Sequence, residues 1–320
     1  MGKYMIGKIL SFAAVFAAAA SVFGGEWQKY GKEPVMGGGE LGTIFDIAVL
    51  KTNKGYEMFS SWRPQKSIAV HYSKDGKKWT SPVIVLPYQD EGWQFRLNRP
   101  CVLVKDGVYH MWYTGQVRPV KGYKGIRSRI GYATSTDGRN FVRQQNFVME
   151  PTEHWEGESI MCPHVIWDES EKIFKMWYSG GETYEPNEIG YATSKDGIHW
   201  EKYKGNPVMV PNKDMKWEKD RVTACQVIKR GNDYLMFYIG FEDIRTARIC
   251  MARSKDGIHN WERYKGNPII QPSPDSWDAD ATYKPYAVFD GKDWLLWYNG
   301  RTGHLERIGL AIHKGADLGF

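Results

Sequence analysis

The stretch IGYATSKDGIHWEKYKGNPV, residues 189–208, is the clearest copy of a unit that recurs along this 320-residue chain. Its turn, SKDGIHW, begins at Ser194, and related turns begin at Ser73, Ser135 and Ser254, so the unit returns about every 60 residues. Each turn follows a short apolar segment such as EIGYAT, and upstream of that lies an aromatic segment such as FKMWYSGG. Five aromatic segments occur, the last being WLLWYNG at residues 294–300.

Every unit has the pattern of four antiparallel strands. Aromatic or apolar residues alternate with small or polar ones between Gly, Asn and Asp turns, which is typical of sheets, and no window favours a long amphipathic helix. The Asp-Gly pair supplies the positive φ of a hairpin turn, so we interpret SxDGxxW as structural rather than as a calcium loop, with its Trp packing between blades. Four such strands form a propeller blade, and five aromatic segments predict an all-β, five-bladed β-propeller.

The last repeat is incomplete, and its missing part stands near the start of the chain. This repeat stops at RIGLAIH, residues 307–313, without the Asp-Gly turn and the strand that contains Trp. The segment EWQKYGKEPVM at residues 26–36 resembles HWEKYKGNPVM at residues 199–209, which closes a complete repeat. An open ring would leave a strand edge unpaired. We therefore predict that the N-terminal segment is the outer strand of the last blade.

The first 25 residues predict a secretory signal peptide, because Lys3 and Lys8 precede an apolar run that ends in small residues. A membrane anchor is the alternative, but the run is short and lacks a following cluster of charges. We expect cleavage before Glu26, a single propeller domain over residues 26–320, and a secreted or periplasmic protein. No later apolar run approaches the ~20 residues of a spanning helix, so no membrane span is expected after cleavage.

Charge and cysteine content exclude some classes of protein. The 43 Lys and Arg and 37 Asp and Glu give a net charge of +6, but no block of like charge occurs, which argues against a nucleic-acid partner. The four cysteines, Cys101, Cys162, Cys225 and Cys250, are too few for a disulfide scaffold. A bridge such as Cys162 with Cys225 stays open, although buried free thiols are favoured. The oligomeric state also stays open.

Functional residues are expected on one face of the disc, where loops enter the first strand of each blade and leave the second. Three entry loops place an acid three residues after a Trp, and these acids are Glu158, Asp220 and Asp280. Asp46 precedes the apolar run of the first inner strand, at the position that Arg99 takes in the second repeat. The exits from the second strands add Arg63, Gln116, Glu182, Glu242 and Arg301 to the same rim.

Carboxylates gathered around one funnel suit glycoside hydrolysis, because one must be protonated to assist the leaving oxygen while another stays ionised. The alternative is that these acids are solvated loop residues. His164, on an inner strand, either faces the axis and binds a sugar hydroxyl or supports an ion, or is a core histidine. No HExxH, paired CxxC, GxSxG or phosphate-binding glycine loop appears, so zinc hydrolysis, serine chemistry and nucleotide use have no support.

With these repeats the chain resembles the five-bladed propeller glycosidases of families 43, 32 and 130 over essentially all of residues 26–320. The resemblance implies that Asp46 acts as base or nucleophile, that Glu158 is the acid, and that Asp220 tunes and orients them. The substrate-binding candidates are Arg99, His164, Glu182, Glu242, Asp280 and Arg301. No cofactor is expected to be required, and a structural calcium or other ion near the axis is compatible with this interpretation. Fructan-cleaving relatives carry a Glu where this chain has Met161, so a fructosidase is not expected.

These observations predict an exported glycosidase that removes a terminal sugar from a glycan with inversion, Asp46 activating water and Glu158 donating the proton. The two acids come from blades 1 and 3, and that separation favours the gap of roughly 6.5–9.5 Å that leaves room for water. Two alternatives remain, a non-catalytic carbohydrate-binding propeller and a glycoside phosphorylase. The expected export and the lack of a dense Arg/Lys cluster in the sequence argue against the phosphorylase.

Overall fold

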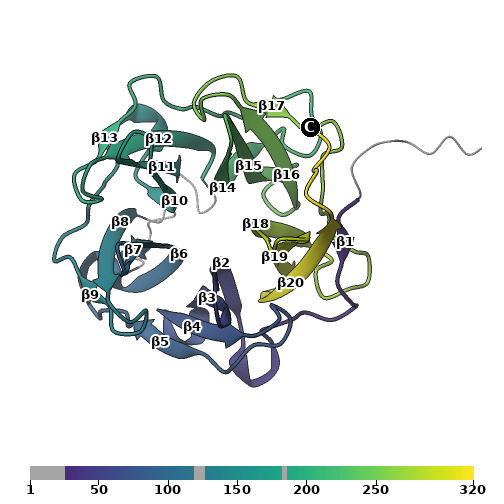
Figure 1. The fold of residues 1–320 in the computed structure, drawn as a ribbon, viewed down its shortest axis with the longest axis horizontal. Helices are drawn as coiled ribbons and strands as arrows, with labels where there is room; N and C mark the ends of the chain where they lie inside the picture. The colour runs from purple at the N-terminus through teal and green to yellow at the C-terminus, as the bar shows by residue number, and fades with distance from the viewer. Residues whose placement is uncertain (1–25, 119–126, 182–185) are drawn as a thin grey trace, which may run out of the picture.

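The computed structural model describes residues 26–118, 127–181 and 186–320, and these form five four-stranded antiparallel sheets around a central axis (Figure 1). The predicted all-β, five-bladed propeller is therefore confirmed. In each blade an inner strand faces the centre of the disc, and these inner strands are β2, β6, β10, β14 and β18. Within the described ranges, no helix has the length and apolar character needed to cross a membrane.

The blades follow one another along the chain. Blade 1 contains β2 (Ile44–Thr52), β3 (Gly55–Trp62), β4 (Ser67–Ser73) and β5 (Val83–Leu86). Blade 2 contains β6 (Arg96–Lys105), β7 (Val108–Gln116), β8 (Ser128–Ser135) and β9 (Val142–Arg143). Blade 3 contains β10 (Ile160–Asp168), β11 (Ile173–Gly180), β12 (Glu188–Ser194) and β13 (Glu201–Lys202). Blade 4 contains β14 (Arg221–Arg230), β15 (Asp233–Phe241), β16 (Ala247–Ser254) and β17 (Glu262–Arg263). Blade 5 contains β18 (Ala281–Phe289), β19 (Asp293–Thr302), β20 (Leu305–Lys314) and β1 (Gln28–Lys29).

The N-terminal segment closes the ring as predicted. Strand β1 pairs antiparallel with β20, Gln28 opposite Ile312 and Lys29 opposite Ala311. A further bridge joins Met36 to Ile308. Blade 5 is thus assembled from both ends of the propeller, and its outer edge is paired rather than open.

The Asp-Gly turns connect neighbouring blades, as the structural interpretation of SxDGxxW requires. In blade 3 the carboxylate of Asp196 accepts hydrogen bonds from the backbone N–H groups of Ile198 and His199. The indole of Trp112 in blade 2 donates to the carbonyl of Gly197 at 2.8 Å. Trp200 packs edge-on against Trp112, with ring centroids 6.1 Å apart. The Trp of the turn therefore packs between blades, which confirms that prediction.

A buried acid fastens the entry loop of a blade to its other strands. In blade 3 this acid is Glu156, which is fully buried and accepts hydrogen bonds from the Tyr178 hydroxyl and the Lys202 ammonium, both at 2.7 Å. In blades 4 and 5 the acids are Glu218, with Tyr238 and Arg263, and Asp278, with Tyr298 and Lys29. In blade 2 the amide of Gln94 takes this place, with Tyr113 and Arg143. Lys29 on β1 therefore binds the buried acid of blade 5, as the bases of the outer strands do in blades 3 and 4.

Replacing Lys29 by Met should lower the free energy of unfolding by about 3 kcal/mol, because it leaves the Asp278 carboxylate, 1% exposed, without its 2.6 Å ion pair. We take the lower end of the range for such losses, since a quarter of the Lys29 side chain is exposed. Urea denaturation measures the change, and Lys32→Met, at an exposed position of the same segment, is the matched control. Equal stabilities of the two variants would show that β1 does not secure the last blade.

Candidate functional site

Each inner strand contains a bulge at the same height, and the bulges bring five residues together around the axis. In every inner strand two residues stand opposite a single residue of the second strand, so the register shifts by one residue. The first residue of each bulge has a left-handed backbone, with φ between 45° and 56°. These five residues, which we call the axial ring, are Asp46, Arg99, Cys162, Ala224 and Lys284. Non-glycine residues in this conformation cost free energy, so the surrounding structure must hold them there.

The preceding blade supplies the support for four of the five bulges. In each case the backbone N–H of the ring residue donates to a polar side chain on the second strand of that blade. These bonds join Asp46 to Asn299 Oδ1 at 3.2 Å, Arg99 to Ser61 Oγ at 3.0 Å, Cys162 to Thr114 Oγ1 at 3.1 Å and Ala224 to Ser179 Oγ at 2.9 Å. In blade 4 the equivalent position carries Ile239, which has no such acceptor. The ring geometry is therefore set by contacts between blades.

Asp46 and Arg99 meet in this ring as an ion pair. The Arg99 Nε lies 3.7 Å from Asp46 Oδ2, and both residues are buried. That distance is too long for a hydrogen bond, and Asp46 Oδ2 accepts none from the described residues although only 3% of the residue is exposed. A buried carboxylate oxygen without a donor is costly unless a ligand or water supplies one. Asp46 is therefore placed to bind a ligand hydroxyl.

Lys284 is the second cation of the ring, and the sequence interpretation did not single it out. Only 5% of the residue is exposed. Its ammonium makes no hydrogen bond or ion pair within the described ranges, and it is not among the fully buried polar atoms that lack a partner, so it stays open to solvent or a ligand. Burial raises the pKa of the Cys225 thiol to about 12, and the positive charge of Lys284 opposes that rise. The same charge acts on Cys101, where burial raises the thiol pKa to about 11. Lys284 therefore points its charge into the centre of the propeller, where an anion would stabilise it.

The remaining side of the ring is apolar. Cys162 and Ala224 belong to a buried cluster with Met161 and Ile239. All four cysteines are free and buried, which confirms the prediction of small buried thiols. The charged residues of the axial ring thus come from blades 5, 1 and 2 alone. Around the ring, the single carboxylate of Asp46 stands between the cations of Arg99 and Lys284.

His164 lies buried beside the axis, where its contacts are those of a core histidine. Its Nε2 donates to the carbonyl of Val227 in blade 4 at 2.9 Å, and its Nδ1 lies 3.9 Å from the Cys101 sulfur. Burial lowers the pKa of His164 to about 4. His164 is therefore neutral at pH 7 and links three blades. A direct role in binding sugar stays a prediction.

The other predicted site residues lie on the rim. Glu158, with 52% of its side chain exposed, pairs with Arg127 at 2.8 Å. Asp220 pairs with the adjacent Arg221, and Glu242 pairs with Arg248. Asp280 and Arg301 line a shared cavity of about 770 Å³ between blades 4 and 5. Glu182 lies outside the described residues. The structure thus brings together Asp46 with Arg99, and Asp280 with Arg301, while Glu158, Asp220 and Glu242 each pair with a basic residue of the rim.

Glu306 is a second buried acid that the sequence interpretation missed. It lies near the start of β20 and is bound by Arg63 Nη2 at 2.5 Å and by the Tyr283 hydroxyl. The Arg63 guanidinium stacks over the ring of Phe45, which precedes Asp46, at 4.3 Å. An alignment of the third strands could have revealed this acid. Glu306 stands at the position where blades 2, 3 and 4 have the uncharged residues Ser128, Asn187 and Ala247. Glu306 thus lies at the junction of blades 5 and 1.

The described residues contain no group of three or more His, Cys, Asp or Glu arranged to hold a metal ion. Two positive charges in the axial ring would also repel a cation at the centre. The calcium or other ion expected near the axis therefore has little support from this geometry and stays a prediction.

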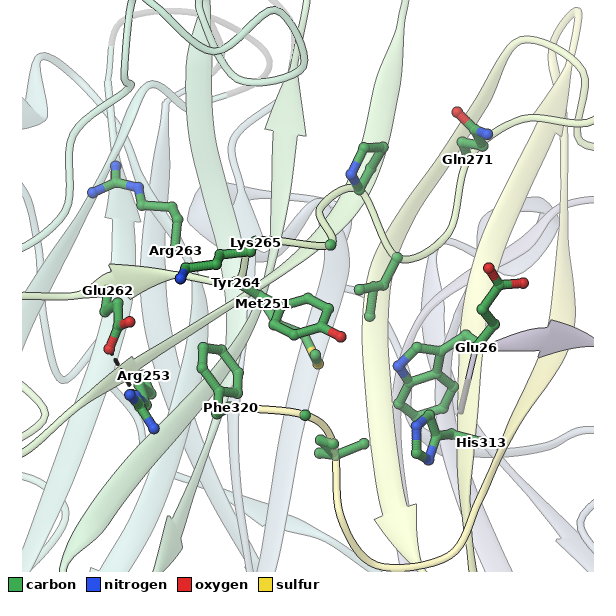
Figure 2. A pocket seen from close by; sticks show the side chains of 16 residues that line it. Glu26, Met251, Arg253, Glu262, Arg263, Tyr264, Lys265, Gln271, His313 and Phe320 are labelled. Atoms are coloured by element: carbon green, nitrogen blue, oxygen red, sulfur yellow. Dashed lines mark hydrogen bonds and ion pairs between the residues drawn. The ribbon is translucent and has the colours of Figure 1, made fainter. Parts of the chain in front are cut away.

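A second cavity lies away from the axis, at the outer edge of the disc. It measures about 960 Å³ and is lined by Glu26 and Trp27 just before β1, by parts of β16 and β17, and by the C-terminal residues. Figure 2 shows Tyr264 and Phe320 near its centre, His313 and Glu26 on one side, and the ion pair of Arg253 with Glu262 on the other. This cavity is formed by outer strands, so it is separate from the axial ring.

Comparison with known proteins agrees with the geometry. The model of the glycosyl hydrolases family 32 N-terminal domain matches residues 90–223 and 173–318, together well over half of the chain. This chain belongs to the superfamily of five-bladed propeller glycoside hydrolases and phosphorylases. The two matches overlap at residues 173–223, because the family model aligns with more than one copy of the repeated blade. This propeller has Met161 at the position where fructan-cleaving enzymes carry an acid.

Two curated relatives of this propeller are phosphorylases from Thermoanaerobacter sp. (strain X514). The chain is 27% identical over 244 residues to a 1,2-beta-oligomannan phosphorylase, covering 74% of this chain and 75% of the relative. It is 33% identical over 135 residues to a beta-1,2-mannobiose phosphorylase, covering 38% of this chain and 42% of the relative. Both alignments support a carbohydrate-active propeller.

Solved structures share the fold of this propeller. A thermostable family-43 glycoside hydrolase superposes with a TM-score of 0.69 at 19% identity, covering 88% of this chain and 92% of that one. A structure from work on family 130, described as mannoside phosphorylases that include hydrolases of beta-1,2 mannosidic linkages in Candida mannan, superposes with a TM-score of 0.68 at 15% identity, covering 94% and 98%. At these identities the likeness shows the fold alone.

Stability should fall between pH 6.5 and pH 4 because of two buried histidines. Burial lowers the pKa of His71 and of His164 to about 4, so in this window the unfolded chain binds more protons than the folded chain. The free energy of unfolding should therefore decrease by about 3 kcal/mol per histidine as the pH falls through the window.

Urea denaturation from pH 7 to pH 4 measures this dependence. In His164→Gln the folded and unfolded chains should differ by about one bound proton fewer, so the slope should be shallower. His154→Gln, at an exposed position, is the control and should leave the slope unchanged. An unchanged slope in His164→Gln would contradict the neutral, buried state of this ring.

Proposed function

We propose that this chain is a glycoside phosphorylase that cleaves the terminal bond of a β-mannoside. The observation that carries the proposal is the axial ring, in which one carboxylate, Asp46, stands between two buried cations, Arg99 and Lys284. Hydrolysis with inversion needs two carboxylates at the bond, one as acid and one as base. Phosphate brings its own nucleophilic oxygen and needs cations to hold it, so this ring suits phosphorolysis better.

The sequence argued against a phosphorylase because no dense Arg/Lys cluster was evident. Arg99 and Lys284 are far apart in the chain, on blades 2 and 5, and only ring closure places them on either side of Asp46. The names of two relatives, 1,2-beta-oligomannan phosphorylase and beta-1,2-mannobiose phosphorylase, support both the reaction and the mannoside class.

In the proposed reaction phosphate binds between Arg99 and Lys284, and the terminal sugar occupies the funnel above them. An oxygen of phosphate attacks the anomeric carbon while the bond from that carbon to the glycosidic oxygen breaks. The negative charge of the bound phosphate offsets the two cations, which lets Asp46 take up a proton. Asp46 gives this proton to the leaving oxygen and later regains one from solvent. The products are a sugar 1-phosphate and a glycan shortened by one unit. Arg63 and Glu306, joined at 2.5 Å, border this site from blades 1 and 5.

Hydrolysis is the second candidate, and the sequence of residues 1–25 favours it. Export would place the enzyme outside the cytoplasm, where a sugar phosphate is less readily used. In that case Asp46 and one further acid, Glu158 or Glu306, would act on water. Secretion or a periplasmic location is part of this alternative and stays a proposal.

Incubation of the protein with β-1,2-mannobiose, with and without inorganic phosphate, tests the proposal. Phosphorolysis yields mannose 1-phosphate and requires phosphate. Lys284→Met should raise the KM for phosphate by about tenfold or more, because one charged contact to the oxyanion is lost. Lys255→Met, on an exposed side chain of an Asp-Gly turn, is the control and should leave this KM unchanged.

Release of free mannose at the same rate without phosphate would contradict phosphorolysis and show that the enzyme is a hydrolase. Binding of the glycan without cleavage in either buffer would instead identify a carbohydrate-binding propeller.

A further inference from the structure

The cavity between blades 4 and 5 is on the same face of the disc as the entrance to the axial ring. It has a volume of about 770 Å³ and is lined by Asp280, Arg301, His304, Gln271 and Ile244 among others. Asp280 immediately precedes β18, and Lys284 of the axial ring lies four residues further along that strand. At the rise of an extended strand, this spacing places the cavity about 13 Å from the ring. The cavity is therefore close enough for a bound glycan to reach both.

Two side chains in this cavity are anchored and yet keep bonding capacity. Arg301 donates from Nη2 to the carbonyl of Arg245 in blade 4 at 2.8 Å, and it has no ion pair within the described residues. Asp280 Oδ2 accepts from the backbone N–H of Gly303 at 2.7 Å, and Asp280 likewise has no ion pair in that part of the chain. A guanidinium has five N–H donors and a carboxylate about four acceptor positions, so most of their capacity remains for a ligand.

The composition of the cavity indicates the chemical class of the ligand. A fixed guanidinium and a fixed carboxylate that do not pair with each other can together bind the donor and acceptor groups of sugar hydroxyls. Ile244, which is 50% exposed, offers an apolar surface to the C–H face of a sugar ring.

We infer that this cavity is a distal glycan subsite, which makes the enzyme prefer oligosaccharides to disaccharides. The inference rests on the proposed function, because it states which length of glycan the proposed active site prefers. A disaccharide bound at the ring does not reach Arg301 and Asp280, whereas a longer chain gains their hydrogen bonds. Arg301 and Asp280 are thus specificity residues that contact the substrate away from the reacting bond.

Two measurements on β-1,2-linked mannobiose and mannotetraose test the inference. Titration calorimetry gives the affinity of each glycan without any need for cleavage, and initial rates with phosphate give kcat/KM. Arg301→Ala should weaken tetrasaccharide binding and lower its kcat/KM by about tenfold or more, with less than a twofold change for the disaccharide. Arg301→Lys, which keeps the charge but loses the planar fork, should fall in between. Asp280→Asn should act in the same direction by a smaller factor.

Arg230→Ala is the matched control, because this exposed arginine ends β14 on the opposite face of the disc. It should change neither glycan's binding, and thermal melting should show that all variants remain folded. Equal losses for both glycans, or no loss with the tetrasaccharide, would overturn the subsite. Failure of the proposed function looks different, since phosphate-dependent cleavage would then be absent in the unchanged protein while calorimetry still reports the effect of chain length.

Discussion

The left-handed bulge of the inner strands is the constraint on which the site depends. Each bulge forces a non-glycine residue to positive φ, which costs on the order of 1–3 kcal/mol. The neighbouring blade compensates by accepting the backbone N–H of that residue, as Ser61, Thr114, Ser179 and Asn299 do. Because the support acts on the backbone, the side chain of the ring residue can vary freely. Asp, Arg, Cys, Ala and Lys occupy five equivalent places without any change of fold.

The entry loops contain two classes of acid, which lie two residues apart in the sequence. The acid directly after the Trp of an entry loop, such as Glu156 or Glu218, is fully buried and is bound by a Tyr and by a base of the outer strand. The acid three residues after that Trp, such as Glu158, is exposed on the rim. Both recur with the repeat, so recurrence alone does not separate a structural carboxylate from one that meets a ligand. Burial and hydrogen-bond partners separate them.

The balance of charge at the axis gives the chemical character of the funnel. A ring of carboxylates would suit activation of water, whereas one carboxylate between two buried cations attracts an oxyanion. Lys284 is the clearest sign, because its ammonium makes no hydrogen bond or ion pair in the described chain and is therefore available to a bound anion. Relatives named as phosphorylases and solved structures named as hydrolases share this fold, so the reaction depends on which side chains occupy the ring.

The sequence by itself determined the blade count, the strand order and the closure by the N-terminal segment, because turn residues and the two-residue period of strands act over short distances. It also placed Asp46 at the start of the first inner strand and Asp280 and Arg301 on the same face. Only the tertiary structure decided that Asp46 meets Arg99, that Lys284 enters the same ring, and that Glu306 reaches the end of blade 1. Those neighbours come from different blades, and their approach depends on the bulge geometry and on ring closure, which no local pattern records.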